Sequence, residues 1–421
     1  MMRSLFSGVA GLRTHQSKMD VIGNNIANVN TVAYKSSNVT FQELMYQTSS
    51  NASGANADTG RAGINAKQIG LGVSTAAINT SITTAGASQS TGNPFDIQIT
   101  GDSFFIVNDG SSNYFTRAGS FYVDGNGNLA MTSNGYNVMG WQEDPNAPGT
   151  IKQDTVSPLK VMSPENMTSE PEQTTEAYIT GIIDKNSTSL SSSSGQVMNI
   201  SFYDDLGYSY VAKFSLFNYE GSGDDKVSYE EGVYRLQLTD IIDSTKNASI
   251  IEEGKTIADY AAIDGEENIY LTYDTETGVY LGYSTGQAPG SNEYTNASDA
   301  KAPLSVNLDS MQKDINIAFD TSTMYDNNGT STVYGTAGNY DGNYAGRKVG
   351  DMSGVAVQAD GKIFATYDNG TTKLLGQISV ASFSNPSGLE KVGENLYQTT
   401  MNSGQFDGIG KDVTSDGAGA F

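Results

Sequence analysis

The chain opens with a stripe of apolar side chains, mostly at heptad spacing, and this feature constrains the fold more than any other. The stripe consists of Leu5, Val9, Leu12, Met19, Ile22 and Ile26. Its spacing predicts an amphipathic α-helix from Ser4 to Asn28, with Ser4 as the N-cap. Three glycines, Gly8, Gly11 and Gly23, each weaken such a helix by about 1 kcal/mol relative to alanine. The helix therefore needs a partner along its apolar stripe, which is either its own domain or another molecule.

Beyond the helix the sequence is typical of a turn-rich β protein. It contains 47 glycines and 24 tyrosines, and its apolar residues fall in short runs between polar turns. Two runs flank the turn Asp124-Gly125-Asn126-Gly127-Asn128, which predicts a β-hairpin. Further strands are expected in the middle of the chain, at residues 178–183, 197–203, 210–217, 234–238 and 270–273.

The order of these runs predicts a mainly β protein with an N-terminal α-helix, in which a β domain is inserted into a discontinuous β core domain. After Trp141 the composition shifts to Pro, Asp, Ser and Thr, and the tight strand-and-turn pattern returns near Gly350. The expected parts are a helix at 1–28, a connector at 29–70, a core domain at 71–145 and 345–421, and an inserted domain at 146–344.

Charge and residue content exclude several classes of function. With a net charge of −24, the chain lacks the clustered Lys and Arg that nucleic acid or an anionic membrane requires. It has no cysteine, which excludes disulfides, thiolate metal ligands and cysteine nucleophiles. No apolar run of about 18 residues is present, so no membrane insertion is expected. The N-terminal run is short and lacks a small-x-small cleavage site, so we do not expect a cleaved signal peptide.

No catalytic, metal or cofactor site is predicted. His15 is the only histidine and lies in the expected helix, which argues against a Ser-His-Asp site and a histidine metal cluster. The turn at Asp124 begins like a calcium loop, but an EF-hand needs Gly and Glu where Leu129 and Gly135 stand. A carboxylate pair for glycoside hydrolysis stays open, since 47 acidic residues are available, although no local feature singles one out.

Three stretches carry recognisable motifs. The first, NNIANVNTVAYK, contributes Asn24, Asn25, Ala27, Asn28, Asn30, Thr31, Tyr34 and Lys35. The second, from Thr91 to Phe121, contributes Asn93, Pro94, Asp96, Phe104, Phe105, Thr116, Arg117, Gly119 and Phe121. The third, from Gly376 to Gly404, contributes Asn385, Pro386, Gly388, Leu389, Gly393 and Asn395. Together they resemble the NNIANxNTxGYK, TGNPxDxxIxGxGFFxV, YTRxGxF and GQIxxAxFxNPxGLxxxGxNLYxxTxxSG patterns of flagellar rod and hook proteins.

This resemblance implies a structural, non-enzymatic role in the bacterial flagellum. The long middle insertion favours the hook branch of the family, whose subunits polymerise into a curved tube that passes torque from the motor to the filament. The opening helix would then line the inner tube, the core domain would form a shell, and the inserted domain would face outward. The implied partners are other copies of the chain, the distal rod, hook cap and hook–filament junction proteins, and the flagellar export apparatus. The implied location is the extracellular hook, reached without a cleaved signal peptide.

The chain departs from the family patterns at three places. Ala33 and Ser103 stand where glycine is usual, and the chain ends at Phe421 without the C-terminal helix that family members normally carry. From the last departure we expect a truncated sequence whose first helix lacks its partner. Two alternative functions stay open: a distal rod subunit, against which the long middle domain argues, and a secreted β-rich carbohydrate-active enzyme, for which only composition speaks.

Overall fold

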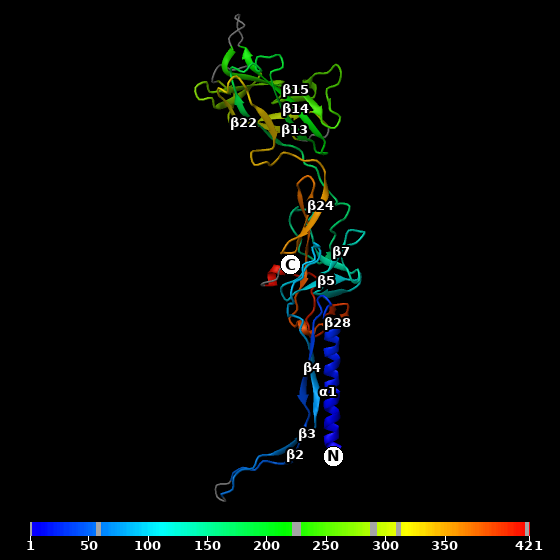
Figure 1. Cartoon of the computed structure of the whole chain (residues 1–421). Coiled ribbons are helices and arrows are strands. Elements are labelled where there is room, and N and C mark those ends of the chain that lie inside the picture. The colour runs from blue at the N-terminus through cyan, green and yellow to red at the C-terminus, as the bar shows by residue number, and fades with distance from the viewer. Residues whose placement is uncertain (1, 56–59, 221–228, 287–292, 309–312, 417–420) are drawn as a thin grey trace. The chain divides into compact units, whose positions relative to one another are not determined.

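The computed structural model describes residues 2–55, 60–220, 229–286, 293–308, 313–416 and 421. Within this part of the chain the structure is mostly β-strand, with one α-helix, α1 (Met2–Ala27), at its start (Figure 1). This confirms the mainly β class with an N-terminal helix. The chain divides into two compact units. The first comprises Met1–Met167, Met352–Thr366 and Thr372–Phe421, and the second comprises Thr168–Asp351 and Tyr367–Thr371.

The unit boundaries lie later in the chain than the expected positions after residues 145 and 344. Residues 146–167 belong to the first unit because β10 (Ser157–Pro158) pairs with β9 (Asn137–Gln142). Val156, Leu159 and Val161 in this stretch are also buried. The polar composition after Trp141 therefore marks an exposed segment of the first unit and not its end. Residues 417–420, part of the chain end considered above, lie outside the described residues.

The expected connector at 29–70 contains strands that the sequence did not predict. These strands are β1 (Ser37–Glu43), β2 (Tyr46–Ser50) and β3 (Lys67–Gly70), and β4 (Val73–Thr80) follows them. β1 pairs with β4, and β2 pairs with β3, both antiparallel. Every residue of β2 and β3 is exposed. Two solvated faces remove the alternation of apolar and polar residues that reveals a strand in a sequence.

The helix packs on the β1–β4 hairpin through small side chains. It begins at Met2, so the expected N-cap Ser4 lies inside its first turn. Gly72, just before β4, approaches the helix so closely that an added Cβ would lie 3.2 Å from Ala10 Cβ and 3.3 Å from Ser7 Cα. In the described part of the chain no helix is long and apolar enough to cross a membrane.

The remaining strands of the first unit come from both ends of the chain. They are β5 (Phe104–Asn108), β6 (Asn113–Thr116), β7 (Phe121–Val123), β8 (Leu129–Met131), β24 (Gly350–Val357), β25 (Lys362–Tyr367), β26 (Thr372–Ile378), β27 (Val380–Ala381), β28 (Glu390–Gly393) and β29 (Leu396–Gln398). The short 3-10 helices η2 (Pro386–Gly388) and η3 (Val413–Asp416) also lie here. Within the sheet, strands that are neighbours follow the order β24-β25-β26-β9-β5-β6-β29-β28. Buried Phe104, Phe115, Trp141 and Tyr397 bring the early and late strands into one core.

The predicted hairpin after residue 120 is confirmed. β7 and β8 pair antiparallel across the turn at residues 124–128. The Asp124 carboxylate accepts hydrogen bonds from the backbone N–H groups of Asn126 and Asn128, at 3.0 and 2.7 Å. The hydrogen bond from Asn128 is the main cause of the lowered pKa of Asp124.

Two sheets enclose the core of the second unit. Its strands are β11 (Thr168–Ser169), β12 (Glu176–Ile183), β13 (Gln196–Tyr203), β14 (Ser209–Glu220), β15 (Tyr229–Asp243), β16 (Ala248–Ser249), β17 (Ala261–Ile263), β18 (Asn268–Tyr273), β19 (Tyr280–Thr285), β20 (Asn296–Ala297), β21 (Ala302–Val306), β22 (Ile315–Met324) and β23 (Tyr334–Ala337), with the 3-10 helix η1 (Ile257–Asp259). One sheet has the order β17-β21-β22-β12-β23, and the other β13-β14-β15-β18-β19-β20. The five strands predicted in this region are confirmed as β12, β13, β14, β15 and β18.

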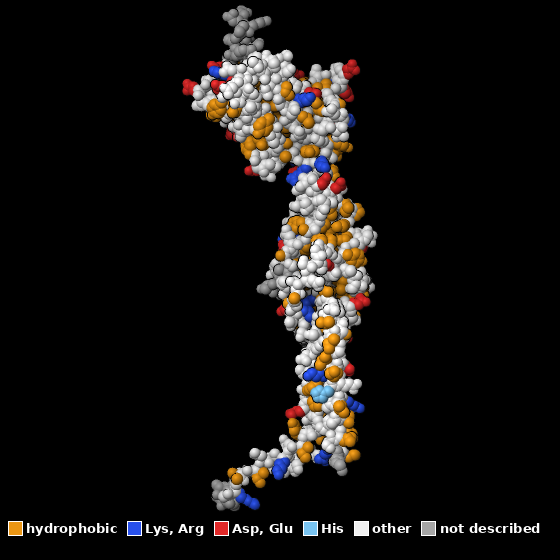
Figure 2. Space-filling model, in the orientation of Figure 1, with side chains coloured by type: hydrophobic (Ala, Val, Ile, Leu, Met, Phe, Trp, Pro, Cys, Tyr) orange, Lys and Arg blue, Asp and Glu red, His pale blue; other side chains and the backbone are white. Residues whose placement is uncertain are grey.

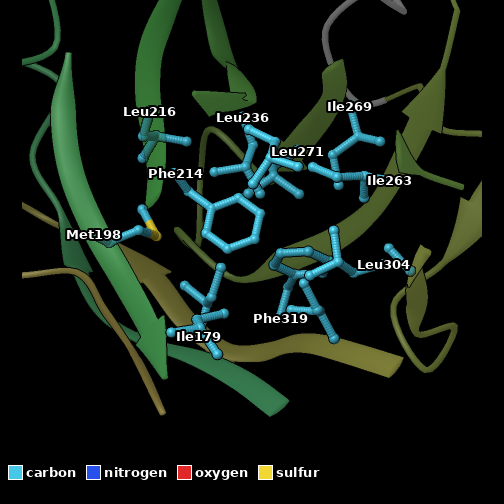
Figure 3. Close-up of a cluster of buried hydrophobic side chains, with 14 of the residues drawn as sticks. Ile179, Met198, Phe214, Leu216, Leu236, Ile263, Ile269, Leu271, Leu304 and Phe319 are labelled. Carbon is cyan, nitrogen blue, oxygen red and sulfur yellow. The ribbon is translucent and has the colours of Figure 1, made fainter. Parts of the chain in front are cut away.

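Apolar side chains from both sheets fill the space between them. Figure 3 shows the Phe214 and Phe319 rings close together, with Ile179, Leu236 and Leu271 around them. All five are nearly inaccessible to solvent. Burial of each such side chain stabilises the unit by about 1.5–3 kcal/mol.

The contact at Gly72 gives a test of how α1 is held. Gly72→Ala combines a positive φ of 124° with a Cβ that crowds Ala10 and Ser7. Gly110→Ala is the matched control, because its φ is 97° and its Cβ would meet no heavy atom within 4 Å. We expect Gly72→Ala to lower the free energy of unfolding by about 1 kcal/mol more than Gly110→Ala, as overpacking does. Equal losses in urea denaturation would show that α1 does not rest on Gly72.

Candidate functional site

α1 has two faces of opposite character. The helix positions that are wholly or partly buried are Ser7, Ala10, Gly11, Thr14, Ser17, Lys18, Val21 and Asn25. Most of these side chains are short or polar, and they face the β1–β4 hairpin. Thr14 Oγ1 donates to Ala10 O at 2.9 Å and reaches Val73 O at 3.4 Å. His15 contacts Phe41 edge-on, with 5.4 Å between the ring centroids, so the one histidine of the chain takes part in packing.

The other face of α1 is apolar and solvated. All six residues of the predicted stripe are exposed, from 38% at Ile22 to 73% at Leu12. Phe6 of α1, and Val29 and Val32 just after its end, are exposed as well, and the heptad spacing did not mark them. Figure 2 shows hydrophobic side chains reaching the surface along this helix, near the single histidine. An amphipathic helix normally turns such a face toward its own core, so this exposed stripe is the candidate functional surface.

The asparagine-rich signature ends the helix and holds the outgoing chain against it. Tyr34 Oη donates to Asn25 Oδ1 at 3.1 Å and accepts from Asn24 Nδ2 at 3.2 Å. Asn25 also bonds both backbone groups of Ser37, through Nδ2 to the carbonyl at 2.8 Å and through Oδ1 from the N–H at 3.0 Å. These side chains fix the direction in which the chain leaves α1 and enters β1.

The rest of the signature extends this network. Asn28 Nδ2 donates to Asn24 O at 3.0 Å, and Thr31 Oγ1 donates to Asn28 Oδ1 at 3.1 Å. Ala27 is the last residue of α1, and Asn30 is exposed. The signature is therefore engaged mainly inside the molecule.

The C-terminal segment reaches back to the signature. Lys391 Nζ on β28 donates to Lys35 O at 3.0 Å and lies over the Tyr34 ring, 5.2 Å from its centroid. Asn395 Nδ2, in the turn between β28 and β29, donates to Val32 O at 3.0 Å. Segments more than 350 residues apart in sequence thus meet at the end of α1.

Arg117 and Lys35 are two basic groups of this region that are partly removed from water. The Arg117 guanidinium donates to Gly101 O at 2.8 Å and lies over the Phe104 ring, 5.0 Å from its centroid. Burial is the main cause that lowers the pKa of Arg117. Burial, and then repulsion from Arg117, lowers the pKa of Lys35, whose Nζ donates to Thr84 O at 2.6 Å.

The other motif residues hold the first unit together. Four of them are buried apolar side chains: Phe104, Phe105, Phe121 and Leu389. Asp96 accepts hydrogen bonds from Thr91 Oγ1 at 2.6 Å and Ser120 Oγ at 3.1 Å. A Cβ at Gly119 would lie 1.7 Å from Ile97 O, so only glycine fits there.

The third motif is joined to the second by a side-chain hydrogen bond. Thr116 Oγ1 donates to Asn395 O at 3.0 Å, and Asn385 Nδ2 donates to Asn402 O at 3.0 Å. Pro386 and Gly388 lie in η2, and Gly393 has a φ of 118° that favours glycine. Asn93 and Pro94 are exposed.

An open pocket of about 390 Å³ lies beside the contact between the second and third motifs. It is lined by Thr31, Val32, Ala118, Ser120, Met131, Thr132, Ser133, Glu394 and Asn395. Hydroxyl groups dominate its polar lining. Among the residues that the structure describes, no group of three or more His, Asp or Glu side chains could hold a metal ion.

Comparison with known proteins gives a consistent family assignment. Residues 98–179 match the family described as the flagellar hook protein FlgE/F/G D1 domain, and residues 5–35 match the flagella basal body rod protein family. The chain is 30% identical over 421 residues to the flagellar hook protein FlgE of Treponema pallidum, covering 96% of this chain and 86% of that protein. Identity to FlgE of Borreliella burgdorferi is also 30%, with the same coverage.

A rod protein is similar over a shorter stretch. The flagellar basal-body rod protein FlgG of Bacillus subtilis is 48% identical over 152 residues, which is 36% of this chain and 54% of that protein. The similarity to hook proteins therefore extends over far more of the chain.

The departure at residue 33 gives a test of how the chain is held after the end of α1. Ala33, where the related patterns carry glycine, has a φ of 60°, in the left-handed region that disfavours residues with a Cβ. Ala33→Gly should raise the free energy of unfolding by about 1 kcal/mol in urea denaturation. As a control of opposite sign, Ala10→Gly inside α1 should lower it by about 1 kcal/mol. A loss of stability in Ala33→Gly would contradict this account of the backbone at residue 33.

Proposed function

Because this chain belongs to the flagellar hook protein family, we propose that it is a structural subunit that polymerises into the hook through the exposed face of α1. The observation that carries the proposal is the apolar stripe, which lies in water although its residue types favour burial. Most polar residues of the motifs shared with the family bind other parts of the same chain, so they position this surface, to which the first motif contributes Ile26.

The stripe is large enough to drive assembly. Full burial of a Val, Leu, Ile or Met side chain gains about 1.5–3 kcal/mol. Association loses roughly 4–15 kcal/mol of translational and rotational freedom. The four stripe residues that are at least 65% exposed, Leu5, Leu12, Met19 and Ile26, together offset a loss within this range when neighbouring copies cover them.

The finer features of this role follow from the family. In our proposal the copies form a curved tube that passes torque to the filament, with α1 in its inner wall and the second unit in its outer part. The ends of the tube meet the distal rod, hook cap and hook–filament junction proteins. The chain leaves the cell through the flagellar export apparatus without a cleaved signal peptide, and the role requires no catalytic step.

A distal rod subunit is the second candidate, because the chain is 48% identical to a rod protein over 152 residues. That similarity covers 36% of this chain, whereas the similarity to hook proteins covers 96%. We therefore favour the hook. Electron microscopy of cells lacking the gene separates the two, since loss of a hook subunit leaves rods without hooks.

A charge placed on the stripe tests the proposal. Leu12→Asp puts a carboxylate where a neighbouring copy must exclude water, so the protein concentration needed for polymerisation should rise at least about tenfold. Sedimentation and negative-stain microscopy measure this change, and circular dichroism checks that the fold is intact. Met401→Asp is the matched control, because Met401 is fully exposed and distant from α1 in sequence. Polymers of Leu12→Asp that form as readily as those of Met401→Asp would refute the proposal.

A further inference from the structure

The sequence contains four Asn-Gly pairs, and the asparagine of each lies in a turn of the structure. In such a pair the backbone nitrogen of the glycine can attack the side-chain amide of the asparagine, because glycine has no Cβ to shield its nitrogen. The attack converts asparagine to aspartate or isoaspartate without an enzyme. The pairs are Asn126-Gly127, Asn134-Gly135, Asn328-Gly329 and Asn369-Gly370.

The glycine nitrogen of every pair donates a hydrogen bond in the folded chain, and this bond holds it back from reaction. In three pairs the acceptor is a backbone carbonyl oxygen of the same turn, at 2.8 to 3.0 Å. The fourth pair differs, because Gly329 N donates to Asp184 Oδ2 at 2.7 Å. The pair at residue 328 is therefore held by a side chain from a distant part of the sequence and not by its own turn.

The other three pairs carry further restraints. Gly127 is buried, and its carbonyl oxygen accepts hydrogen bonds from Val161 N at 2.8 Å and Met162 N at 3.0 Å. The side-chain oxygens of Asn134 and Asn369 accept hydrogen bonds from the backbone N–H two residues further on, at 3.1 and 3.0 Å. These bonds fix either the glycine or the amide that it would attack.

Asn328 lacks such restraints. It is exposed, and within the described part of the chain its side-chain amide has no hydrogen-bond partner. Its φ of 55° lies in the left-handed region, which is unfavourable for a residue with a Cβ, so the backbone gains by leaving it. The turn depends on the fully buried Asp184, whose carboxylate also accepts hydrogen bonds from Asn327 N at 2.7 Å and Asn186 N at 2.8 Å.

We propose that Asn328 is the site at which the folded chain first loses ammonia, and that the hydrogen bond from Gly329 to Asp184 controls the rate. When this bond opens, Gly329 N gives its proton to hydroxide and bonds to Cγ of Asn328. The bond between Cγ and Nδ2 breaks, and the nitrogen leaves as ammonia with a proton from water. Water then opens the cyclic imide at either of its carbonyl carbons, which leaves aspartate or isoaspartate.

The product no longer fits the native turn. Asn328 N donates to Asp326 Oδ1 at 3.0 Å, so a new carboxylate at residue 328 lies close to an existing one. Isoaspartate also lengthens the backbone between this bond and the bond from Gly329 to Asp184. The modification should therefore loosen the loop between β22 and β23, where β23 is an edge strand of its sheet. This inference goes beyond the proposed function and does not depend on it.

Peptide mapping by mass spectrometry, after incubation at mildly alkaline pH, measures all four rates in one sample. In the folded chain we expect Asn328 to react at least about tenfold faster than each of the other three, because its turn opens most easily. In the chain unfolded in urea the four rates should agree within about threefold, because no turn then protects any pair. A rate at Asn328 in the folded chain that is equal to or below the others would overturn the proposal.

The role of Asp184 is tested by Asp184→Asn. This change keeps the shape of the side chain but removes the charge that strengthens the hydrogen bond from Gly329, so the rate at Asn328 should rise at least about fivefold. Circular dichroism checks the fold. An unchanged rate at Asn328 in the folded variant would refute the control by Asp184, and if the variant does not fold, the order of the four rates in the unaltered chain decides the proposal.

Asp124→Asn is the matched control. Its carboxylate also lies beside an Asn-Gly pair, but it accepts hydrogen bonds from Asn126 N and Asn128 N, whereas Gly127 N donates to the backbone carbonyl of residue 124. The acceptor of the reactive nitrogen is thus unchanged, and the rate at Asn126 should change less than about twofold. An equal acceleration in both variants would show that a lost carboxylate merely loosens the turn, and would overturn the specific role of Asp184.

Discussion

The packing of α1 on its hairpin by its small and polar face is the contact on which the rest of the functional surface depends. Gly72 brings the hairpin close to Ser7 and Ala10, and Thr14 and Asn25 add hydrogen bonds to the backbone. A helix held by this face must turn its apolar stripe outward. The usual arrangement of an amphipathic helix is thereby reversed, and the hydrophobic surface is left for another molecule.

The asparagine-rich signature fixes the end of α1, and with it the exposed stripe, to the rest of the first unit. Asn25 and Tyr34 fix the chain at the end of α1, and Lys391 and Asn395 bind the same segment from the other end of the sequence. Thr116 then ties Asn395 to the sheet of the first unit. Because Asn24, Asn25 and Tyr34 of the signature are engaged inside the molecule, these residues indicate how the chain is held at the end of α1 and not where copies meet.

Much of the fold was predictable where one side of an element is buried. The heptad pattern gave α1 to within two residues, and alternation gave β12, β13, β14, β15 and β18. The strands β2 and β3 were missed because both of their faces are solvated. The boundary between the first and second units was placed too early in the chain, because buried Leu159 anchors a polar stretch to the first unit. At the candidate site the stripe was predicted, but its exposure to solvent was not, because spacing identifies an apolar face without saying whether the chain covers it. The contact of Gly72 with α1 was not predicted, because it depends on a distance that the sequence does not contain.

The two faces of α1 also differ in the kind of force they use. Hydrogen bonds from Asn24, Asn25 and Tyr34 are directional, so they hold the helix end in one geometry. Apolar contact along Leu5, Leu12 and their neighbours is non-directional and depends mainly on the area removed from water. In the proposed assembly, adjacent copies that shift by a small distance therefore keep most of their attraction, while each subunit keeps its own shape. A hook that bends as it rotates needs both properties, and this chain places them on opposite sides of one helix.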